Sequence, residues 1–244
     1  MTIDESYCAL VNCWIGYAIE SNVKELYLDV YYPRGYYHVP DSVMAAKSIT
    51  KLTILRCTFE SFHSDINLSS LKKLLLDEVY LDDQIFQTLI AGCPVVEDIK
   101  FERCFGLKNI HLSGLPKLVA FEVSLNPVLK SMEIEASNLE SLLIYLWTPC
   151  QINLHPCENL KKLALHSVTV TDKWLHDFLS KHPLIESLNL HNCNMLKTIN
   201  ISSDRMKNLI FSHCKELVEA NIIAPNLCRL TQFGNNKLPY VARA

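Results

Sequence analysis

Bulky apolar residues recur along the chain in the pattern Ω-x-x-Ω-x-Ω, in which Ω is an apolar side chain and x is any residue. Consecutive copies of the pattern start 21 to 26 residues apart. The last two Ω positions of each copy are separated by one residue, and this period of two is typical of a strand with one buried face. The copies are Val23-Leu26-Leu28, Ile49-Leu52-Ile54, Leu71-Leu74-Leu76, Val96-Ile99-Phe101, Leu118-Phe121-Val123, Leu139-Leu142-Ile144, Leu160-Leu163-Leu165, Ile185-Leu188-Leu190, Met206-Leu209-Phe211 and Leu227-Leu230-Gln232, the last without its final apolar residue.

A strand that returns with this period predicts a leucine-rich-repeat solenoid, because each turn can bury its apolar side only by stacking on its neighbours. We therefore expect an α/β fold, a right-handed solenoid of about ten turns with a parallel β-sheet as its concave face. The predicted organisation is an N-terminal helical cap over residues 1–22, a repeat domain over 23–233 and a C-terminal tail over 234–244.

The cap region contains an uncharged stretch, residues 6–19, which is shorter than the roughly 20 residues needed to span a bilayer. Its apolar residues recur with helical spacing, so we expect an amphipathic helix and no membrane contact. The apolar face of this helix is predicted to carry Leu10, Trp14 and Ala18, with Val11 and Ile15 beside it.

A second set of the same pattern lies 10 or 11 residues after its parent copies and predicts short strands on the convex wall. Its members are Leu107-Ile110-Leu112, Leu129-Met132-Ile134, Leu196-Ile199-Ile201 and Leu217-Ala220-Ile222, with abbreviated versions at 66–68 and 152–154. Two longer turns instead have helical periodicity on this side. These helices are predicted to begin after Asp82 or Thr171 and to end before Pro94 or Pro183.

The two helical turns lie 89 residues apart, as do Pro94 and Pro183, and Cys104 and Cys193. A unit of four turns, one helical and three β-walled, is therefore used twice, and we expect one solenoid without an internal linker. Several units place a cysteine three positions after the last apolar residue, where the repeat takes a small inward side chain. We interpret these thiols as small buried hydrophobes; they are Cys57, Cys104, Cys193 and Cys214.

Composition and charge limit the partners and the cellular compartment that we expect. The net charge is −3, from 26 acidic and 23 basic residues, with no long run of either sign, so we expect no nucleic-acid partner. The N-terminus is acidic where a signal peptide is basic, and the ten cysteines are spread over the chain, so we expect a cytoplasmic or nuclear protein with reduced thiols.

Catalytic motifs are missing from the sequence. The six glycines are too widely spaced for a phosphate-binding loop, and no nucleophile elbow, H-E-x-x-H or C-x-x-C occurs. The nearest metal-like group, Cys150, His155 and Cys157, has irregular spacing. We therefore expect no enzymatic activity, no catalytic residues, no cofactor and no metal.

The expected concave face offers a binding surface instead. Outward residues of neighbouring strands should form two columns, in which an acidic end (Asp77, Glu102, Glu122) adjoins a more apolar middle. Exposed aliphatic and aromatic residues side by side indicate a protein contact, unless a terminal segment or loop covers them. The candidate protein-binding residues are Lys100, Glu102, Glu122, Leu143, Tyr145, His166, Asn189 and His191. His166 and His191 are read as solvated surface histidines.

Four stretches resemble the leucine-rich-repeat region of plant F-box/LRR proteins, including the group with a C-terminal FBD segment. They are W-I-x-x-A-x-x-x-N-V-K-E-L-Y-L-D at 14–29, V-P-D-S-V-M-A-A-K-S-I-T-K-L-T-I-L-R-C at 39–57, L-K-K-L-L-L-D-E-V-Y-L-D-D at 71–83, and L-I-A-G-C-P-V-V-E-D-I-K-F-E-R-C at 89–104. The resemblance implies substrate recognition for a Skp–cullin–F-box ubiquitin ligase, with an unidentified protein substrate as partner.

This chain departs from that family's pattern, which places an F-box before the repeats to dock the Skp adaptor. No F-box-like segment precedes Trp14, and no FBD tail is recognisable beyond Leu230. We expect a fragment, a truncated product or an incomplete gene model, and a Skp-type adaptor as partner only if an F-box lies upstream. The alternatives are a stand-alone interaction scaffold or decoy, an enzyme, and a hormone-sensing receptor, for which ten turns are few.

Overall fold

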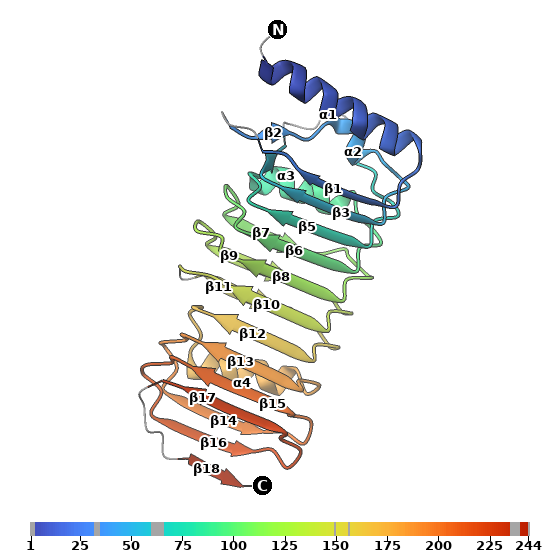
Figure 1. Ribbon diagram of the computed structural model, residues 1–244. Coiled ribbons are helices and arrows are strands. Elements are labelled where there is room, and N and C mark those ends of the chain that lie inside the picture. Colours follow the sequence, from blue (N-terminus) through green and yellow to red (C-terminus); the bar gives the residue numbers. More distant parts are fainter. Residues whose placement is uncertain are drawn as a thin grey trace.

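The computed structural model describes residues 3–31, 35–59, 66–148, 150–155, 157–234 and 240–243. The chain winds into an elongated solenoid whose longest wall is a single sheet of ten strands (Figure 1). The strands of this sheet are, in spatial order, β1 (Glu25–Asp29), β3 (Lys51–Leu55), β5 (Lys73–Asp77), β6 (Asp98–Glu102), β8 (Ala120–Ser124), β10 (Ser141–Tyr145), β12 (Lys162–His166), β13 (Ser187–His191), β15 (Asn208–Ser212) and β17 (Arg229–Phe233).

Each neighbouring pair in this sheet is parallel, and its register follows the repeat. Leu142 of β10, for example, lies beside Leu163 of β12, and Leu163 lies beside Leu188 of β13. The ten strands coincide with the ten copies of the apolar pattern, so the predicted α/β leucine-rich-repeat solenoid is confirmed. We call the outward side of this sheet the concave face.

The core is the stack of inward side chains from successive turns. Leu163 is 1% exposed, and the rings of Phe101 and Phe121 meet edge to face with centroids 6.1 Å apart. The last turn differs, because Leu230 of β17 is 40% exposed. β17 ends the sheet, so no further strand of the described residues covers its apolar side.

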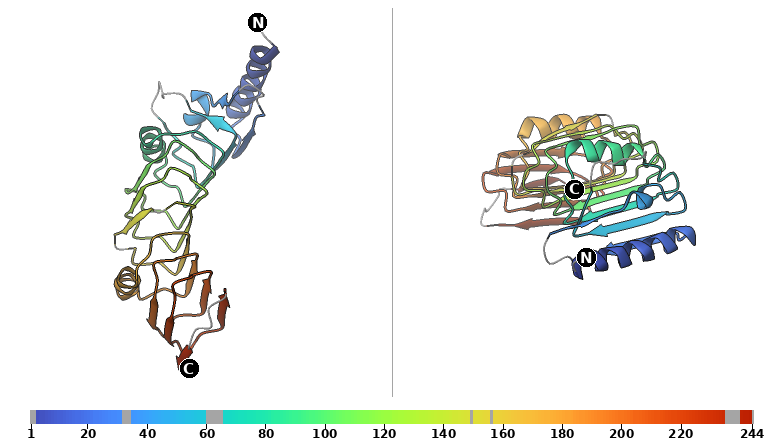
Figure 2. Two further views of the ribbon diagram at one scale, coloured as in Figure 1. Left: turned by 90° about the vertical axis from the view of Figure 1, so that its left-hand side faces the viewer. Right: turned by 90° about the horizontal axis from the view of Figure 1, so that it is seen from above.

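The opposite, convex wall alternates helices with short strands. Helices α3 (Asp83–Ala91) and α4 (Asp172–Lys181) lie on this side, across the solenoid from the ten-stranded sheet (Figure 2). Two three-stranded parallel sheets occupy other turns. They contain β7 (Asn109–Leu112), β9 (Ser131–Ile134) and β11 (Gln151–Leu154), and β14 (Thr198–Ser202), β16 (Glu219–Ile223) and β18 (Tyr240–Arg243). The predicted convex strands and helices are confirmed, except that residues 66–68 form no strand.

Both convex helices begin at the predicted capping residues. The side chain of Asp82 accepts a hydrogen bond from the Ile85 N–H at 2.8 Å, and that of Thr171 accepts one from the Trp174 N–H at 3.2 Å. These bonds satisfy helix N–H groups that have no partner within the helix.

The residue after each cap forms hydrogen bonds between its helix and the next turn of the solenoid. The Asp83 carboxylate accepts the backbone N–H groups of residues 108 and 109 at 2.7 and 3.0 Å. Asp172 does the same for residues 197 and 198, at 2.8 and 3.1 Å. Burial acts to raise the pKa of both carboxyls, but their hydrogen bonds prevail and hold the pKa of each below its usual value. The 89-residue unit therefore repeats this contact as well as its sequence.

A left-handed residue follows most of the concave strands. Its N–H group donates to a strand carbonyl of the next turn, as in Ser167 N–H to the His191 carbonyl at 2.8 Å. This bond continues the ladder past the end of the strand and fixes the direction of the bend. The residues with φ between 49° and 56° at these bends are Arg56, Glu78, Arg103, Leu125, Ser167, Asn192 and His213.

The N-terminal helix α1 (Ile3–Glu20) lies at the end of the solenoid next to β1, beside the short helix α2 (Asp41–Met44) and the strand pair β2 (Tyr37–His38) and β4 (Cys57–Thr58) (Figure 1). The helix is confirmed, but its predicted apolar face is wrong. Val11 and Ile15 are buried, whereas Leu10 and Trp14 are 47% and 62% exposed. Packing on the first turn buries the narrower aliphatic stripe.

The predicted C-terminal tail contains β18, whose backbone pairs in parallel with β16. These residues therefore extend the convex wall. The division of the chain into cap, repeat domain and tail stays a prediction.

Candidate protein-binding face

Two columns of outward side chains run along the concave face, as the register requires. In the first column Lys100 lies beside Glu122, and Leu143 follows on the next strand. In the second column Tyr145, His166 and His191 lie on three successive strands, β10, β12 and β13. The structure therefore brings the predicted residues together in space, while their role in binding stays a proposal.

The N-terminal part of this face carries a network of ion pairs. Lys100 Nζ lies 3.4 Å from Glu102 Oε2 and 3.0 Å from Glu122 Oε1. Arg103 contacts Glu102 at 3.1 Å and Glu78 at 3.1 Å, and it also pairs with Asp77. The acidic end predicted from Asp77, Glu102 and Glu122 is thus largely paired, which sequence columns alone did not indicate.

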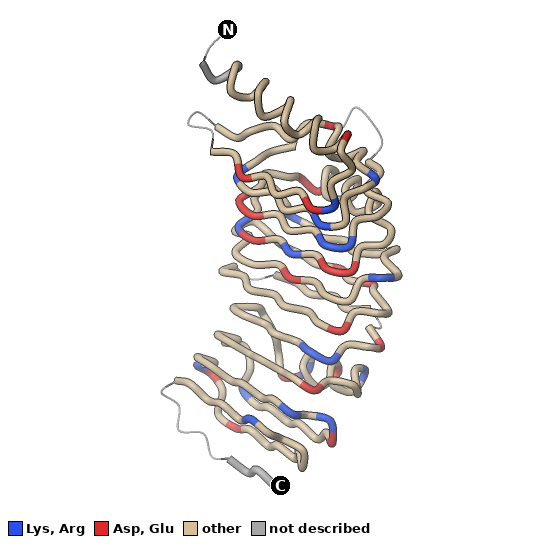
Figure 3. The backbone as a smooth tube through the Cα atoms, turned by 45° about the vertical axis from the view of Figure 1, so that its right-hand side comes forward, with Lys and Arg blue, Asp and Glu red and all other residues tan. Residues whose placement is uncertain are grey.

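We call Asp77, Glu78, Lys100, Glu102, Arg103 and Glu122 the ion-pair network. It contains four carboxylates and two cations, so it carries a formal charge of −2 at neutral pH. Burial raises the pKa of Asp77, although the Arg103 charge acts in the opposite direction. Charged residues of both signs crowd into these turns, below α1 in Figure 3.

In the second column, the following strands β10, β12 and β13 carry aromatic rings instead of charges. The Tyr145 and His166 ring centroids are 3.9 Å apart, and those of His166 and His191 are 3.7 Å apart with planes inclined by 9°. His213, at the bend after β15, adds a fourth ring 4.9 Å from His191. We call these four residues the imidazole ladder.

The stacked rings of His166 and His191 are stabilised in their neutral form. Burial, followed by the nearby His191 and His213, lowers the pKa of His166 to about 4. Burial and His213 also lower the pKa of His191, whose Nδ1 is hydrogen-bonded to Ser212 Oγ at 2.6 Å. Stacked imidazoles repel one another when they are charged, so the His166–His191 stack favours the neutral form of both rings. The two histidines are therefore ordered parts of the face rather than freely solvated side chains.

Sequence reasoning missed two contributors to this face, Arg103 and His213. Both occupy the left-handed bend that follows a strand, where the alternation of inward and outward residues no longer holds. The signal that could have found them is their constant position, the first residue after each strand. Leu143 and Asn189 lie in the first column on β10 and β13, the strands that also carry Tyr145 and His191, as expected.

The group Cys150, His155 and Cys157 does not form a ligand set. Both cysteines are buried, and His155 Nε2 instead meets Glu133 Oε1 at 2.8 Å. Within the described ranges, no three His, Cys, Asp or Glu side chains come together in a way that could hold a metal ion. In the same part of the chain, no helix is long and apolar enough to cross a membrane.

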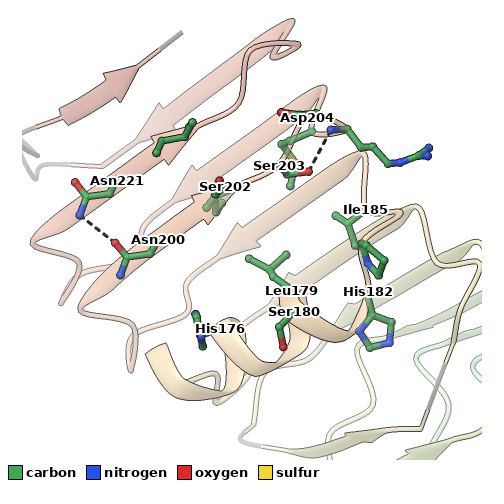
Figure 4. Close-up of a pocket in the computed structure, with 15 residues that line it drawn as sticks. His176, Leu179, Ser180, His182, Ile185, Asn200, Ser202, Ser203, Asp204 and Asn221 are labelled. Carbon is green, nitrogen blue, oxygen red and sulfur yellow. Dashed lines mark hydrogen bonds between the residues drawn. The ribbon is translucent and has the colours of Figure 1, made fainter.

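The convex wall contains a groove of about 640 Å³ between α4 and the strands β14 and β16 (Figure 4). Asn221 Nδ2 donates to Asn200 Oδ1 at 3.0 Å along one side of it, and Leu179 lines the other. In the first 89-residue unit Gln87 Nε2 bridges the corresponding gap to the His111 carbonyl at 2.8 Å. His176, which replaces Gln87 in the second unit, lines the groove. No sequence pattern indicated this difference.

The sequence profile of the family described as "At1g61320/AtMIF1, LRR domain" matches residues 1–155 and 147–242 of this chain. The chain is also similar to three Arabidopsis thaliana proteins. It is 24% identical to F-box/LRR-repeat protein At3g03360 over 206 residues, which is 82% of this chain and 42% of that protein. It is 34% identical to F-box/LRR-repeat protein At1g06630 over 97 residues, 38% of this chain and 24% of that protein.

The third relative is F-box/FBD/LRR-repeat protein At1g13570, which is 26% identical over 133 residues, 47% of this chain and 32% of that protein. The chain thus spans less than half of the length of each of these relatives. The matches confirm the resemblance drawn from the four sequence stretches, and together with the fold they support a protein-interaction module.

Proposed function

Because this chain belongs to the leucine-rich-repeat family described as At1g61320/AtMIF1, LRR domain, we propose that its concave face binds a target protein. The observation that carries the proposal is the ordered row of half-buried rings, Tyr145, His166 and His191, beside Leu143 on a face that no other described element covers. Large rings held in place by their neighbours supply contact area at little cost in side-chain entropy.

We further propose that the bound protein is the substrate of an SCF-type ubiquitin ligase. The F-box in the names of the three relatives supports this role, since each of them joins an F-box to leucine-rich repeats by name. A Skp-type adaptor would then be a partner of the whole F-box protein. The buried free thiols fit a reducing compartment, the cytoplasm or the nucleus.

The test compares the wild-type chain with a concave variant, Leu143→Ser with Tyr145→Ser, and a convex control, Ile223→Ser. Ile223 is 52% exposed on the opposite wall, so both variants should melt close to the wild-type temperature. Proteins captured from plant extract are identified by mass spectrometry and then tested as purified pairs. We expect at least one purified partner to lose tenfold or more of its affinity for the concave variant alone. Equal affinity for all three chains would rule out this face.

A stand-alone scaffold or decoy is the second candidate. It would bind the target without a Skp-type adaptor. Reading the coding sequence upstream of Met1 separates the two roles. An in-frame F-box there supports the ligase role, and a stop codon directly before Met1 supports the decoy.

A further inference from the structure

The two regions of the concave face differ in the chemistry that each can recognise. In the ion-pair network four carboxylates share two cations, and Glu122 has Lys100 as its only ion-pair partner among the described residues. Asp77, 8% exposed, keeps one carboxylate oxygen without a hydrogen-bond donor within the described part of the chain. This region therefore carries surplus negative charge, which favours a cationic group.

The imidazole ladder has the opposite preference. Tyr145, His166 and His191 are half-buried rings, and the pKa values of the two histidines are lowered, so these rings offer contact to a flat apolar group and no charge for an ion to pair with. Aromatic side chains prefer ring contacts of this kind, with centroids about 4.5–7 Å apart. A lysine or arginine gains more at the network than at the ladder, and an aromatic residue gains more at the ladder.

The spacing between the two regions is fixed by the sheet. Neighbouring strands lie about 4.8 Å apart. Glu122 is on β8 in the first column, whereas Tyr145 and His166 are on the next two strands in the second column, two residues further along. Combining the two offsets gives a distance from the network to the ladder of about 8–12 Å. An extended peptide rises about 3.1–3.4 Å per residue, so this distance corresponds to about two to four residues.

We propose that the concave face binds an extended segment of the partner protein in which a lysine or arginine lies about two to four positions from an aromatic residue. The basic group contacts Glu122 and Glu102, and the aromatic ring packs on Tyr145 and His166. The inference rests on the proposed function, since it names the kind of segment that the same face takes.

The experiment is a selection of random 12-residue peptides displayed on phage against the immobilised chain. Three variants are selected in parallel: Glu102→Gln with Glu122→Gln, Tyr145→Ser with His166→Ser, and the convex control Asn221→Ser. Thermal melting first establishes that each variant is folded. Substituting both glutamates changes the local formal charge from −2 to 0, while it retains side-chain size.

We expect the wild-type chain and the convex control to enrich peptides with a basic and an aromatic residue at the stated spacing. The glutamine variant should lose at least tenfold of the basic enrichment and retain the aromatic one. The serine variant should lose at least tenfold of the aromatic enrichment and retain the basic enrichment.

Two other outcomes separate this inference from the function on which it rests. Peptides that depend on the concave residues but lack the basic–aromatic pair, for example acidic ones, would overturn the inference and leave the binding face intact. Enrichment that neither concave variant changes, or no enrichment at all, would overturn both the inference and the binding face.

Discussion

His166 and His191 stack in register across two neighbouring strands, with ring centroids 3.7 Å apart and planes only 9° from parallel. Two protonated imidazoles at this distance would repel each other strongly in a partly buried setting. The contact therefore depends on the neutral form of both rings. Measuring stability as a function of pH tests whether the two rings stack in this way.

The first prediction concerns acid stability. Burial and the neighbouring histidines lower the pKa of His166 from 6.5 to about 4 in the folded chain. The unfolded chain thus binds the proton more readily. The stabilising contribution is complete above pH 6.5, is lost as the pH falls from 6.5 to 4, and changes no further below that. The His166→Gln variant should lose less stability than the wild type over this window in urea unfolding. Parallel curves would show that the ring titrates normally.

The second prediction tests the core register. Leu163→Asp places a carboxylate in the stacked interior, where Leu163 is 1% exposed, and should cost about 4 kcal/mol or more of unfolding free energy. The matched control is Ala164→Asp, one residue further along β12 and on the outward side, which should cost about 1 kcal/mol or less. Calorimetry of both variants measures the difference. Equal losses at the two positions would place the strand in a different register.

The third prediction addresses the contact between a helical turn and the turn that follows it. Asp83→Ala removes the acceptor of the backbone N–H groups of residues 108 and 109 and should destabilise the fold by about 2 kcal/mol. Asp98, whose carboxylate is 3.6 Å from Lys73 in an exposed pair, provides the control, since Asp98→Ala should cost less than about 1 kcal/mol. Urea denaturation gives both values.

The same contact has a pH signature. Since its hydrogen bonds keep the pKa of Asp83 below 3.8, the stabilisation is present above pH 3.8 and is lost as the pH falls further through the folded-state pKa. The Asp83→Ala variant should therefore lose its disadvantage relative to the wild type in strong acid. A constant difference at every pH would assign the effect to packing instead of the carboxylate.

The fourth prediction concerns the thiols. Seven of the ten cysteines are buried, and burial raises the pKa of Cys57, Cys93 and Cys104 to about 12, whereas Cys13 and Cys228 are exposed. Iodoacetamide at neutral pH should modify the two exposed thiols of the native chain first, and the buried ones only after unfolding. Peptide mass spectrometry at increasing reaction times identifies the order in which the cysteines are modified. Early labelling of Cys104 would contradict its inward position.

Most of the fold was predictable because, in a solenoid, the residues that pack within one turn lie close together in the sequence. Each inward Leu-x-Leu pair forms its own strand, and Asp82 and Thr171 begin their helices by contacts three residues away. The buried face of α1 was predicted wrongly, because Trp14 and Val11 lie on adjacent stripes of one helix and only the neighbouring turn decides which is covered.

The candidate face was predictable in part for the same reason. Its columns follow from the period of two, which placed Tyr145, His166 and His191 side by side. The pairing of Glu102 with Arg103 and the addition of His213 to the ladder arise at left-handed bends, where side-chain direction depends on the turn. The groove beside α4 is lined by His176, where the first unit has Gln87 bonded to the His111 carbonyl, and the sequence repeat alone did not indicate this difference.

The helices α3 and α4 occupy the outer wall of turns that elsewhere hold a strand. A helix with its side chains is about 10 Å across, whereas a strand takes about 4.8 Å of the stacking direction. The outer wall must therefore spread at these two levels while the inner one keeps its spacing. We therefore expect the solenoid to bend mainly at the levels of α3 and α4, so that the three strand-walled turns between them set the angle between its two ends.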